Sequence, residues 1–269
     1  MPVESFADAV NLLNNNPGSA LKLNQDETVN QTFNITADST INLNGHTLSH
    51  SENKVALAVN NNATLTINGQ KSGSAFYGRI NVGKATDDNG NVVINGGTYS
   101  CGEEQTVLHL NGTCQNSSVT ITNATIISPN DNGIQLSAKG TYTITNSRIS
   151  GKTGIYLKSG DLTLTNSTVS STATEHTAYN FNNNGSNPTG DAIVVDSCAY
   201  PGGIPTLVIG EGNTINDVAG SGNVQIGYYE KTPDVEFGNV TSVSNEFTIN
   251  DGYVWSEAEG AYKLVKVSA

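Results

Sequence analysis

A short repeat decides the fold of this 269-residue chain: it reads VTITNA at residues 119–124, YTITNS at 142–147 and LTLTNS at 162–167. Apolar and polar residues alternate in each copy, as in a β-strand with one buried face, and asparagine then favours a turn. Related segments end at Asn44, Asn68 and Asn95, so the marker asparagine returns every 20 to 28 residues. This interval is typical of a solenoid, in which stacked repeats bury a common core.

Two further strand segments accompany most copies of the repeat. One follows the marker asparagine, as at Thr98-Tyr99, and a third strand precedes the next copy. Three short strands in about 23 residues predict one coil of a right-handed parallel β-helix, with coils stacked at about the 4.8 Å strand spacing. We expect nine or ten coils, which at that spacing form a rod about 45–50 Å long.

Two other all-β architectures fit the pattern less well. Propeller blades need about 40–45 residues each. A β-sandwich requires hairpin turns between its strand pairs, and the Asn-Gly pairs at 44–45, 68–69 and 95–96 do look like hairpin turns. These pairs recur once per repeat rather than between every two strands, so we favour the β-helix and keep the sandwich as the alternative.

Both ends of the chain differ from the repeat. Within residues 3–14, the apolar residues recur at helical spacing, and Ser5 with Asp8 forms a weak capping pattern. We therefore expect a capping helix within residues 1–19. The β-helix then covers residues 20–245, with an insertion at 171–190. A C-terminal β-hairpin cap at 246–269 would turn near 257–260.

The composition limits the partners of the protein. The net charge is −12, with 12 basic and 24 acidic residues, which argues against nucleic acid, because phosphate binding needs a basic surface. No apolar run reaches the roughly 20 residues of a membrane span. Cys101, Cys114 and Cys198 do not form a disulfide framework, although a single Cys101–Cys114 bridge stays open.

The first ten residues, MPVESFADAV, lack the basic and apolar regions of a signal peptide. Three explanations remain open. The chain stays in the cytoplasm where it is made, a leader has been removed, or the protein leaves the cell by lysis or within an assembled particle.

With these strands and caps, the chain resembles the pectate-lyase-like superfamily of right-handed β-helices. It is most similar to the short Asn/Thr-rich versions found in bacterial surface repeats and in phage capsid fibres or decoration proteins. The resemblance covers roughly residues 20–250 and rests on the repeat pattern, so it implies a fold more than a function.

The resemblance also implies what an enzyme on this fold would carry. Lyases use a calcium-binding acid cluster with a nearby Arg or Lys base, and hydrolases use paired aspartates, a Gly-His-Gly and an Arg-x-Lys. Asp87 and Asp88 form the best acid cluster and are a weak candidate metal site, since calcium prefers oxygen ligands, but a polar loop tip explains them equally well. The segments at His46 and Arg148 do not match the hydrolase pattern. We therefore expect no catalytic residues and no cofactor, with a polysaccharide lyase or hydrolase as the least favoured function.

Two groups of residues are candidates for ligand binding. The outward positions of the third strand in successive coils are Ala58, His109, Gln135, Tyr156, Val194 and Gln225, and the candidates among them are His109, Gln135 and Tyr156. The insertion adds Glu175, His176, Tyr179 and Phe181. Aromatic side chains among neutral amides suit contacts with carbohydrate or protein. Solvated histidines and a self-packed loop are the alternatives.

These observations favour a non-enzymatic structural or binding protein. We expect a virion surface component, such as a capsid decoration or head fibre protein, whose partners are capsid or other virion proteins or a surface glycan. The resemblance implies a homo-oligomer, with a trimer as the common form. The alternative is a secreted or surface-attached bacterial adhesin that binds carbohydrate.

Overall fold

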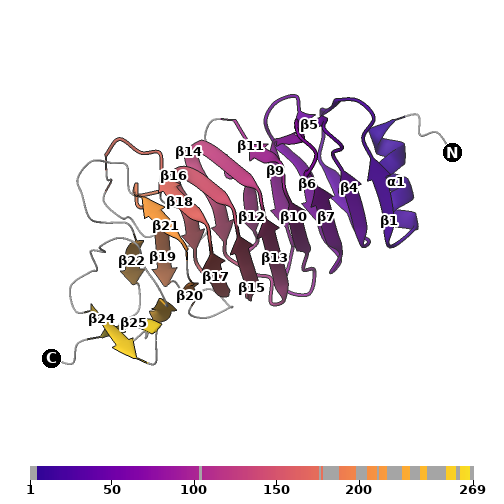
Figure 1. The fold of residues 1–269 in the computed structure, drawn as a ribbon. Helices are drawn as coiled ribbons and strands as arrows, with labels where there is room; N and C mark the ends of the chain where they lie inside the picture. Colours follow the sequence, from indigo (N-terminus) through magenta and orange to yellow (C-terminus); the bar gives the residue numbers. More distant parts are fainter. Residues whose placement is uncertain are drawn as a thin grey trace.

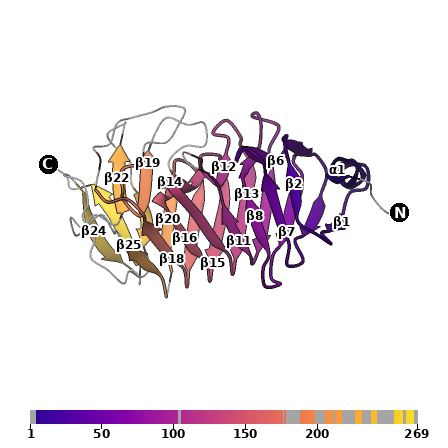
Figure 2. The ribbon, with the colours of Figure 1, turned by 90° about the horizontal axis from the view of Figure 1, so that it is seen from above.

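The chain forms a parallel β-solenoid with one short helix near its N-terminus, which confirms the predicted fold class (Figure 1). The structure is a computed structural model. It describes residues 5–102, 105–175, 177, 188–197, 205–210, 212–216, 226–230, 237–240, 253–258 and 261–266. Within these ranges the strands run side by side along the rod, and α1 lies at one end of it (Figures 1 and 2).

Each coil adds strands to the same two parallel sheets. Sheet A contains β1 (Ser19–Lys22), β4 (Ser39–Asn42), β7 (Thr64–Asn68), β10 (Asn91–Asn95), β13 (Ser117–Thr122), β15 (Gly140–Thr145), β17 (Asp161–Thr165) and β20 (Thr206–Ile209). Sheet B has two rows of strands, which we call B1 and B2. Row B1 contains β2 (Glu27–Val29), β5 (Thr47–His50), β8 (Ala75–Tyr77), β11 (Thr98–Ser100), β18 (Thr168–Ser171) and β21 (Thr214–Asn216). Row B2 contains β3 (Phe33–Ile35), β6 (Val55–Val59), β9 (Arg79–Val82), β12 (Leu108–Leu110), β19 (Ile193–Ser197) and β22 (Ile226–Glu230). Two long strands, β14 (Thr125–Leu136) and β16 (Arg148–Leu157), run through both rows.

The number of coils is smaller than predicted. The solenoid has about six turns and sheet A has eight strands, whereas a uniform interval of 23 residues predicts nine or ten coils. The interval is not uniform, because the chain between β17 and β20 includes the insertion at 171–190. In addition, the last three described strands, β23 to β25, form an antiparallel sheet and do not extend the parallel sheets.

The core is a set of apolar columns that the strand register creates. Ile41, Ile67, Ile94, Ile121 and Ile144 are neighbours on successive strands of sheet A, and each is fully buried. Because parallel register repeats the same inward position in every coil, one alternating sequence per coil is enough to build a continuous core.

The marker asparagines have two different structural roles. Asn44, Asn123, Asn146 and Asn166 have positive φ angles between 48° and 56°, which asparagine tolerates better than most residues, and they turn the chain out of sheet A. The Asn-Gly pair at 44–45 therefore joins strands of two different sheets and is no hairpin.

Asn68 and Asn95 instead remain within their strands, on the outer face of sheet A. The Asn68 amide donates to the Asn42 side chain at 2.8 Å, and the Asn95 amide donates to that of Asn68 at 3.0 Å. These hydrogen bonds form an amide ladder between neighbouring coils.

The first end of the solenoid carries the predicted helix. Helix α1 (Phe6–Asn15) is capped by Ser5, whose hydroxyl accepts from the Asp8 backbone N–H at 3.1 Å. Its four buried apolar residues, Phe6, Ala9, Val10 and Leu13, are those that the helical spacing predicts.

At the other end, β24 (Tyr253–Ala258) and β25 (Ala261–Lys266) form the expected antiparallel hairpin. A third strand, β23 (Phe237–Val240), pairs with β25 and was not predicted. Strand β23 lies before the predicted hairpin segment 246–269, and no copy of the repeat marks its position in the sequence.

Candidate functional site

The outward column of row B2, which we call the B2 ladder, brings together three of the predicted binding residues. Register places Asn81, His109, Gln135, Tyr156 and Val194 side by side on successive strands. The alignment of His109, Gln135, Tyr156 and Val194 is as predicted. Asn81, which lies in β9 and pairs with His109, was not among the predicted outward positions. Val194 pairs with Gly227, while the predicted Gln225 lies outside the described residues.

The B2 ladder is on the outside of the sheet, yet much of it is buried. The exposed fraction is 4% for Gln135 and 0% for Tyr156 and Val194, and only Asn81 and His109 are half-buried. These side chains point away from the apolar core, but they do not form an open stripe on the surface of the chain. Their role in ligand binding stays a prediction.

A buried polar cluster surrounds Tyr156. The Tyr156 hydroxyl donates to Asp196 Oδ2 at 3.0 Å, and Lys158 Nζ lies 3.4 Å from the same oxygen. Lys158 Nζ is also 5.6 Å from the centre of the Tyr156 ring, within range of a cation–π interaction. Next to this group, the Gln135 amide donates to Ser137 Oγ at 3.2 Å. We call Gln135, Ser137, Tyr156, Lys158 and Asp196 the Tyr156 cluster.

Sequence reasoning missed Lys158 and Asp196, although a signal was present. Each lies two residues after a predicted outward position, Tyr156 or Val194, and a strand presents alternate residues on one face. Extending the outward column by one step would have placed a lysine beside an aspartate on neighbouring coils.

His109 lies at the edge of this cluster and is uncharged at neutral pH. Burial, together with the smaller effect of the positive charges of Arg79 and Lys158, lowers its pKa to about 3. A neutral imidazole with such a low pKa is a poor general base at neutral pH, because efficient proton transfer requires a pKa near the working pH.

The depressed pKa predicts a loss of stability in acid. An unfolded histidine has a pKa near 6.5, so between pH 6.5 and about 3 the unfolded chain binds a proton that folded His109 does not. Stability therefore falls as the pH falls through this range. We expect His109 to lower the free energy of unfolding by about 2 kcal/mol at pH 5 relative to pH 8. Urea unfolding of the wild type and of His109→Gln at both pH values measures this. Between pH 8 and pH 5, His109→Gln should lose about 2 kcal/mol less of its free energy of unfolding than the wild type loses. An imidazole that titrates near pH 6.5 in NMR spectra of the folded protein would contradict the assignment.

A second polar group occupies the corner between rows B1 and B2. Thr106 Oγ1 donates to Asp131 Oδ2 at 3.1 Å, and the Asp131 charge acts on the largely buried Arg79. Burial raises the pKa of the neighbouring Cys101 thiol to about 11, so this thiol is not a ready nucleophile. Cys101 and Cys114 are both buried and free, so the Cys101–Cys114 bridge does not form.

The insertion is described only in part. Glu175 is exposed and, with Lys152, Thr172 and Pro129, lines an open hollow of about 450 Å³. His176, Tyr179 and Phe181 lie outside the described residues. The candidate binding role of this segment stays a prediction.

The weak candidate metal residues lie in a turn. Asp88 Oδ1 accepts a hydrogen bond from the Asn61 backbone N–H, and Asp87 is exposed. Among the described residues, no three His, Cys, Asp or Glu side chains gather in a way that could hold a metal ion. The structure gives Asp88 a local role, which is to join two coil turns.

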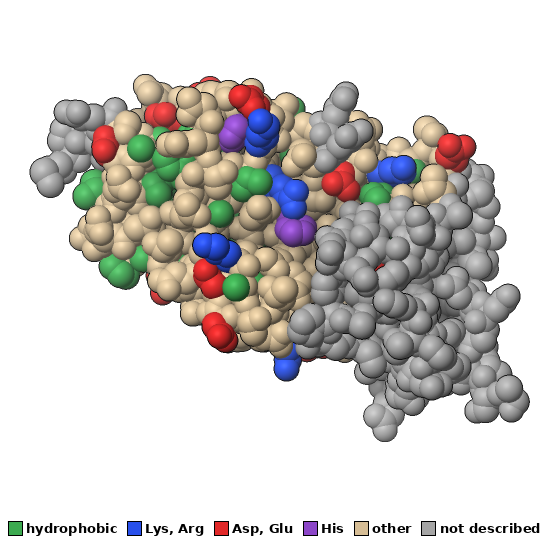
Figure 3. Space-filling model, turned by 180° about the vertical axis from the view of Figure 1, so that it is seen from behind, with side chains coloured by type: hydrophobic (Ala, Val, Ile, Leu, Met, Phe, Trp, Pro, Cys, Tyr) green, Lys and Arg blue, Asp and Glu red, His purple; other side chains and the backbone are tan. Residues whose placement is uncertain are grey.

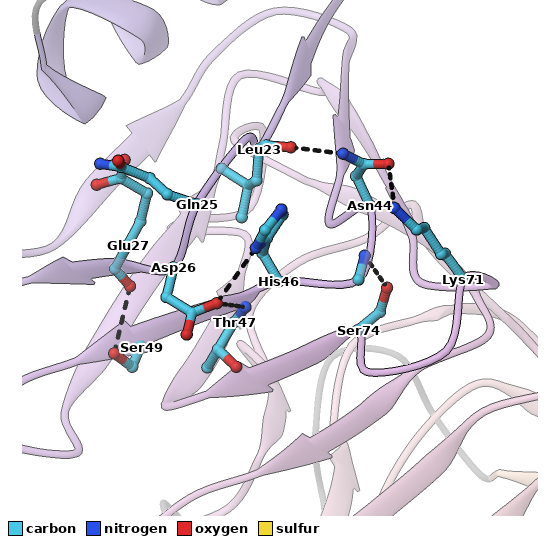
Figure 4. A network of polar contacts seen from close by, with 11 residues as sticks. Leu23, Gln25, Asp26, Glu27, Asn44, His46, Thr47, Ser49, Lys71 and Ser74 are labelled. Atoms are coloured by element: carbon cyan, nitrogen blue, oxygen red, sulfur yellow. Dashed lines mark hydrogen bonds and ion pairs between the residues drawn. The ribbon is translucent and has the colours of Figure 1, made fainter.

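Another polar network joins the first three coils (Figure 4). Asp26 Oδ1 accepts from the Thr47 backbone N–H at 2.9 Å and lies 3.5 Å from His46 Nδ1, while the Gly45 N–H donates to Ser74 Oγ at 2.8 Å. Each of these contacts connects one coil to the next. We therefore assign the network to the stacking of coils.

On the outer face of sheet A, the strand register aligns residues into columns that are largely uncharged. The central column contains Thr40, Thr66, Val93, Thr120, Thr143, Thr163 and Val208. From β4 to β15 the outward strand residues are Thr, Asn, Ser or Val, and the first carboxylate is Asp161 at the start of β17. On the described surface seen in Figure 3, charged side chains are scattered among larger uncharged areas.

Comparison with protein-family models, curated proteins and solved structures found no match for this chain. Among the described residues, no helix is long and apolar enough to cross a membrane.

Proposed function

We propose that this protein is a non-enzymatic structural component of a particle surface, such as a capsid decoration or head fibre protein, and that copies associate through the outer face of sheet A. One observation supports this most directly. The chain has a net charge of −12, yet the strands β4 to β15 present no charged residue on that face.

The physical argument concerns the cost of bringing copies together. A net charge far from zero keeps proteins apart, so copies associate with least repulsion where no carboxylate meets another. Desolvating hydroxyl and amide groups costs less than desolvating charges, and the threonine methyl groups add apolar area. A rigid row of identical strands also loses little conformational entropy when it is covered.

Thr120→Glu tests this proposal. Thr120 lies between Val93 and Thr143 in the central column, so a glutamate there places a negative charge in the middle of the face. In sedimentation or light-scattering measurements we expect the wild type to form a closed oligomer, a trimer in the simplest case, and Thr120→Glu to be a monomer. The matched control is Thr98→Glu, on row B1 away from sheet A, which should leave the oligomer unchanged.

The particle assignment needs a separate measurement. We expect the oligomer to co-sediment with particles assembled from capsid proteins encoded beside it, and Thr120→Glu to reduce that binding. A wild type that is monomeric over a wide concentration range and never co-sediments would overturn the proposal.

The hollow beside Glu175 supports a second candidate function, carbohydrate binding. Its volume is in the range of small-ligand sites, and it combines a carboxylate with hydroxyl and amide groups. A glycan array probed with the wild type and with Glu175→Gln would separate an adhesin from a purely structural protein.

A further inference from the structure

The Tyr156 cluster contains an amine and a carboxyl group that are within reach of each other and shielded from water. Lys158 Nζ and Asp196 Oδ2 are 3.4 Å apart, and both side chains have an exposed fraction of 0%. They come from neighbouring coils, since Lys158 follows β16 and Asp196 lies in the paired strand β19.

The two oxygens of Asp196 have different surroundings. Oδ2 accepts the hydrogen bond from the Tyr156 hydroxyl at 3.0 Å. Oδ1 is buried and has no hydrogen-bond partner in the described part of the chain. A buried ionised carboxylate with one unsatisfied oxygen is costly, because its lost hydration is only partly replaced. An ordinary ion pair would leave this cost in the folded protein.

We propose that Lys158 and Asp196 form an intramolecular amide bond, and that the ion pair is its precursor. A proton first moves from the ammonium group to the carboxylate, which leaves a neutral amine and a neutral acid. The step that follows starts from the form of this acid that carries its proton on Oδ1. Low polarity around the pair favours this exchange, since it removes two buried charges.

The Nζ lone pair then attacks Cγ, and negative charge develops on Oδ2, where the Tyr156 hydroxyl stabilises it as an oxyanion donor. Nitrogen passes one proton to the Oδ1 hydroxyl, and Oδ1 leaves as water. The ammonium and the carboxylate thus become one amide and one water molecule, without any oxidant, metal or cofactor.

Amide formation removes the unsatisfied carboxylate oxygen that makes the ion pair unfavourable. The unsatisfied atom, Oδ1, is the one that departs, while Oδ2 becomes the amide carbonyl and keeps its hydrogen bond from Tyr156. Holding the two groups in contact within a packed fold supplies the high effective concentration that amide formation between free side chains lacks. The bond would also close the chain around the insertion at 171–190 and tie two neighbouring coils together.

The test is the mass of the intact, full-length protein under denaturing conditions. We expect a mass lower than the sequence mass by one water molecule, and a proteolytic fragment in which residues 158 and 196 are joined. The exposed ion pair of Lys54 with Glu52 is an internal control, whose two residues should be recovered without a link.

Three variants sharpen the test. Lys158→Met should have its full sequence mass. Asp196→Asn should lose one ammonia rather than one water, because its amide nitrogen becomes the leaving group. Tyr156→Phe should slow the reaction, so that freshly made protein is a mixture of linked and unlinked chains. A folded wild type that keeps its full sequence mass after prolonged storage, with residues 158 and 196 in separate fragments, would overturn the proposal. That measurement needs no variant to fold.

Discussion

Gly140→Ala is expected to destabilise the solenoid by about 3 kcal/mol or more, because the added methyl group collides with the backbone of the neighbouring coil. A Cβ built on Gly140 would lie 1.7 Å from the Ser117 carbonyl oxygen. Gly140 pairs with Ser117 between β15 and β13, so the collision cannot be relieved by turning a side chain. One of the two strands must move.

The movement would spread beyond this pair. A third coil also packs closely against Gly140, because a Cβ built on Gly160 would lie 2.7 Å from the Gly140 carbonyl oxygen. Shifting β15 away from β13 therefore presses it towards the following coil. Because adjacent coils share one core, we expect the loss to appear as a lower free energy of unfolding of the whole central solenoid.

Urea unfolding of the wild type, Gly140→Ala and Thr141→Ala measures this effect. Thr141 is the next residue of β15 and its side chain points outward, so its replacement causes no backbone collision and should change the free energy of unfolding by no more than about 1 kcal/mol, which is the span of strand propensities. Equal stability of Gly140→Ala and Thr141→Ala would show that the coils are not in close contact at this point.

Much of the fold could be predicted because one physical rule repeats along the chain. The alternation in 119–122, 142–145 and 162–165 places apolar residues inward and Thr outward in each of these coils, and parallel stacking needs nothing more to align them. The turn at each marker asparagine could be predicted for the same reason, since a non-glycine residue with positive φ is most often asparagine or aspartate.

Other features depend on contacts between coils, which a single repeat does not encode. Gly140 is one of 28 glycines, and its requirement follows only from the position of Ser117 in the previous coil. The burial of Gln135 and Tyr156 likewise depends on what packs over the sheet. Strand alternation correctly assigns them to its outer side but contains no information on that covering. Lys158 and Asp196 are separated by the insertion in sequence and meet only because their coils are adjacent.

Leu13→Asp is expected to open the first end of the solenoid and to cause end-to-end association or aggregation. Leu13 is 3% exposed on the inner face of α1, in the same core cluster as Phe6, Val10 and Leu23. A carboxylate there would be buried without a partner, at a cost of several kcal/mol, which is enough to detach a ten-residue helix.

The detached helix would expose both apolar surface and backbone. Phe6 packs edge-to-face on Phe33 of β3 with ring centres 5.1 Å apart, so its loss uncovers an aromatic ring at the end of the core. Asn14 donates to the Asn34 carbonyl and accepts from the Thr36 N–H, both at 2.8 Å, so α1 also satisfies backbone groups of the first coil. An uncovered coil with unpaired backbone groups is a template for another chain.

Leu12→Asp is the matched control for Leu13→Asp. Leu12 is 42% exposed on the opposite face of α1, so Leu12→Asp adds the same charge to the same helix without burying it. In sedimentation and light-scattering measurements, Leu12→Asp should match the wild type, whereas Leu13→Asp should form larger species as the protein concentration rises. Faster amide exchange in β1 and β3 of Leu13→Asp would locate the damage at this end. If both variants keep the wild-type size and exchange pattern, α1 does not protect the solenoid, and its close packing on the first coil serves another purpose.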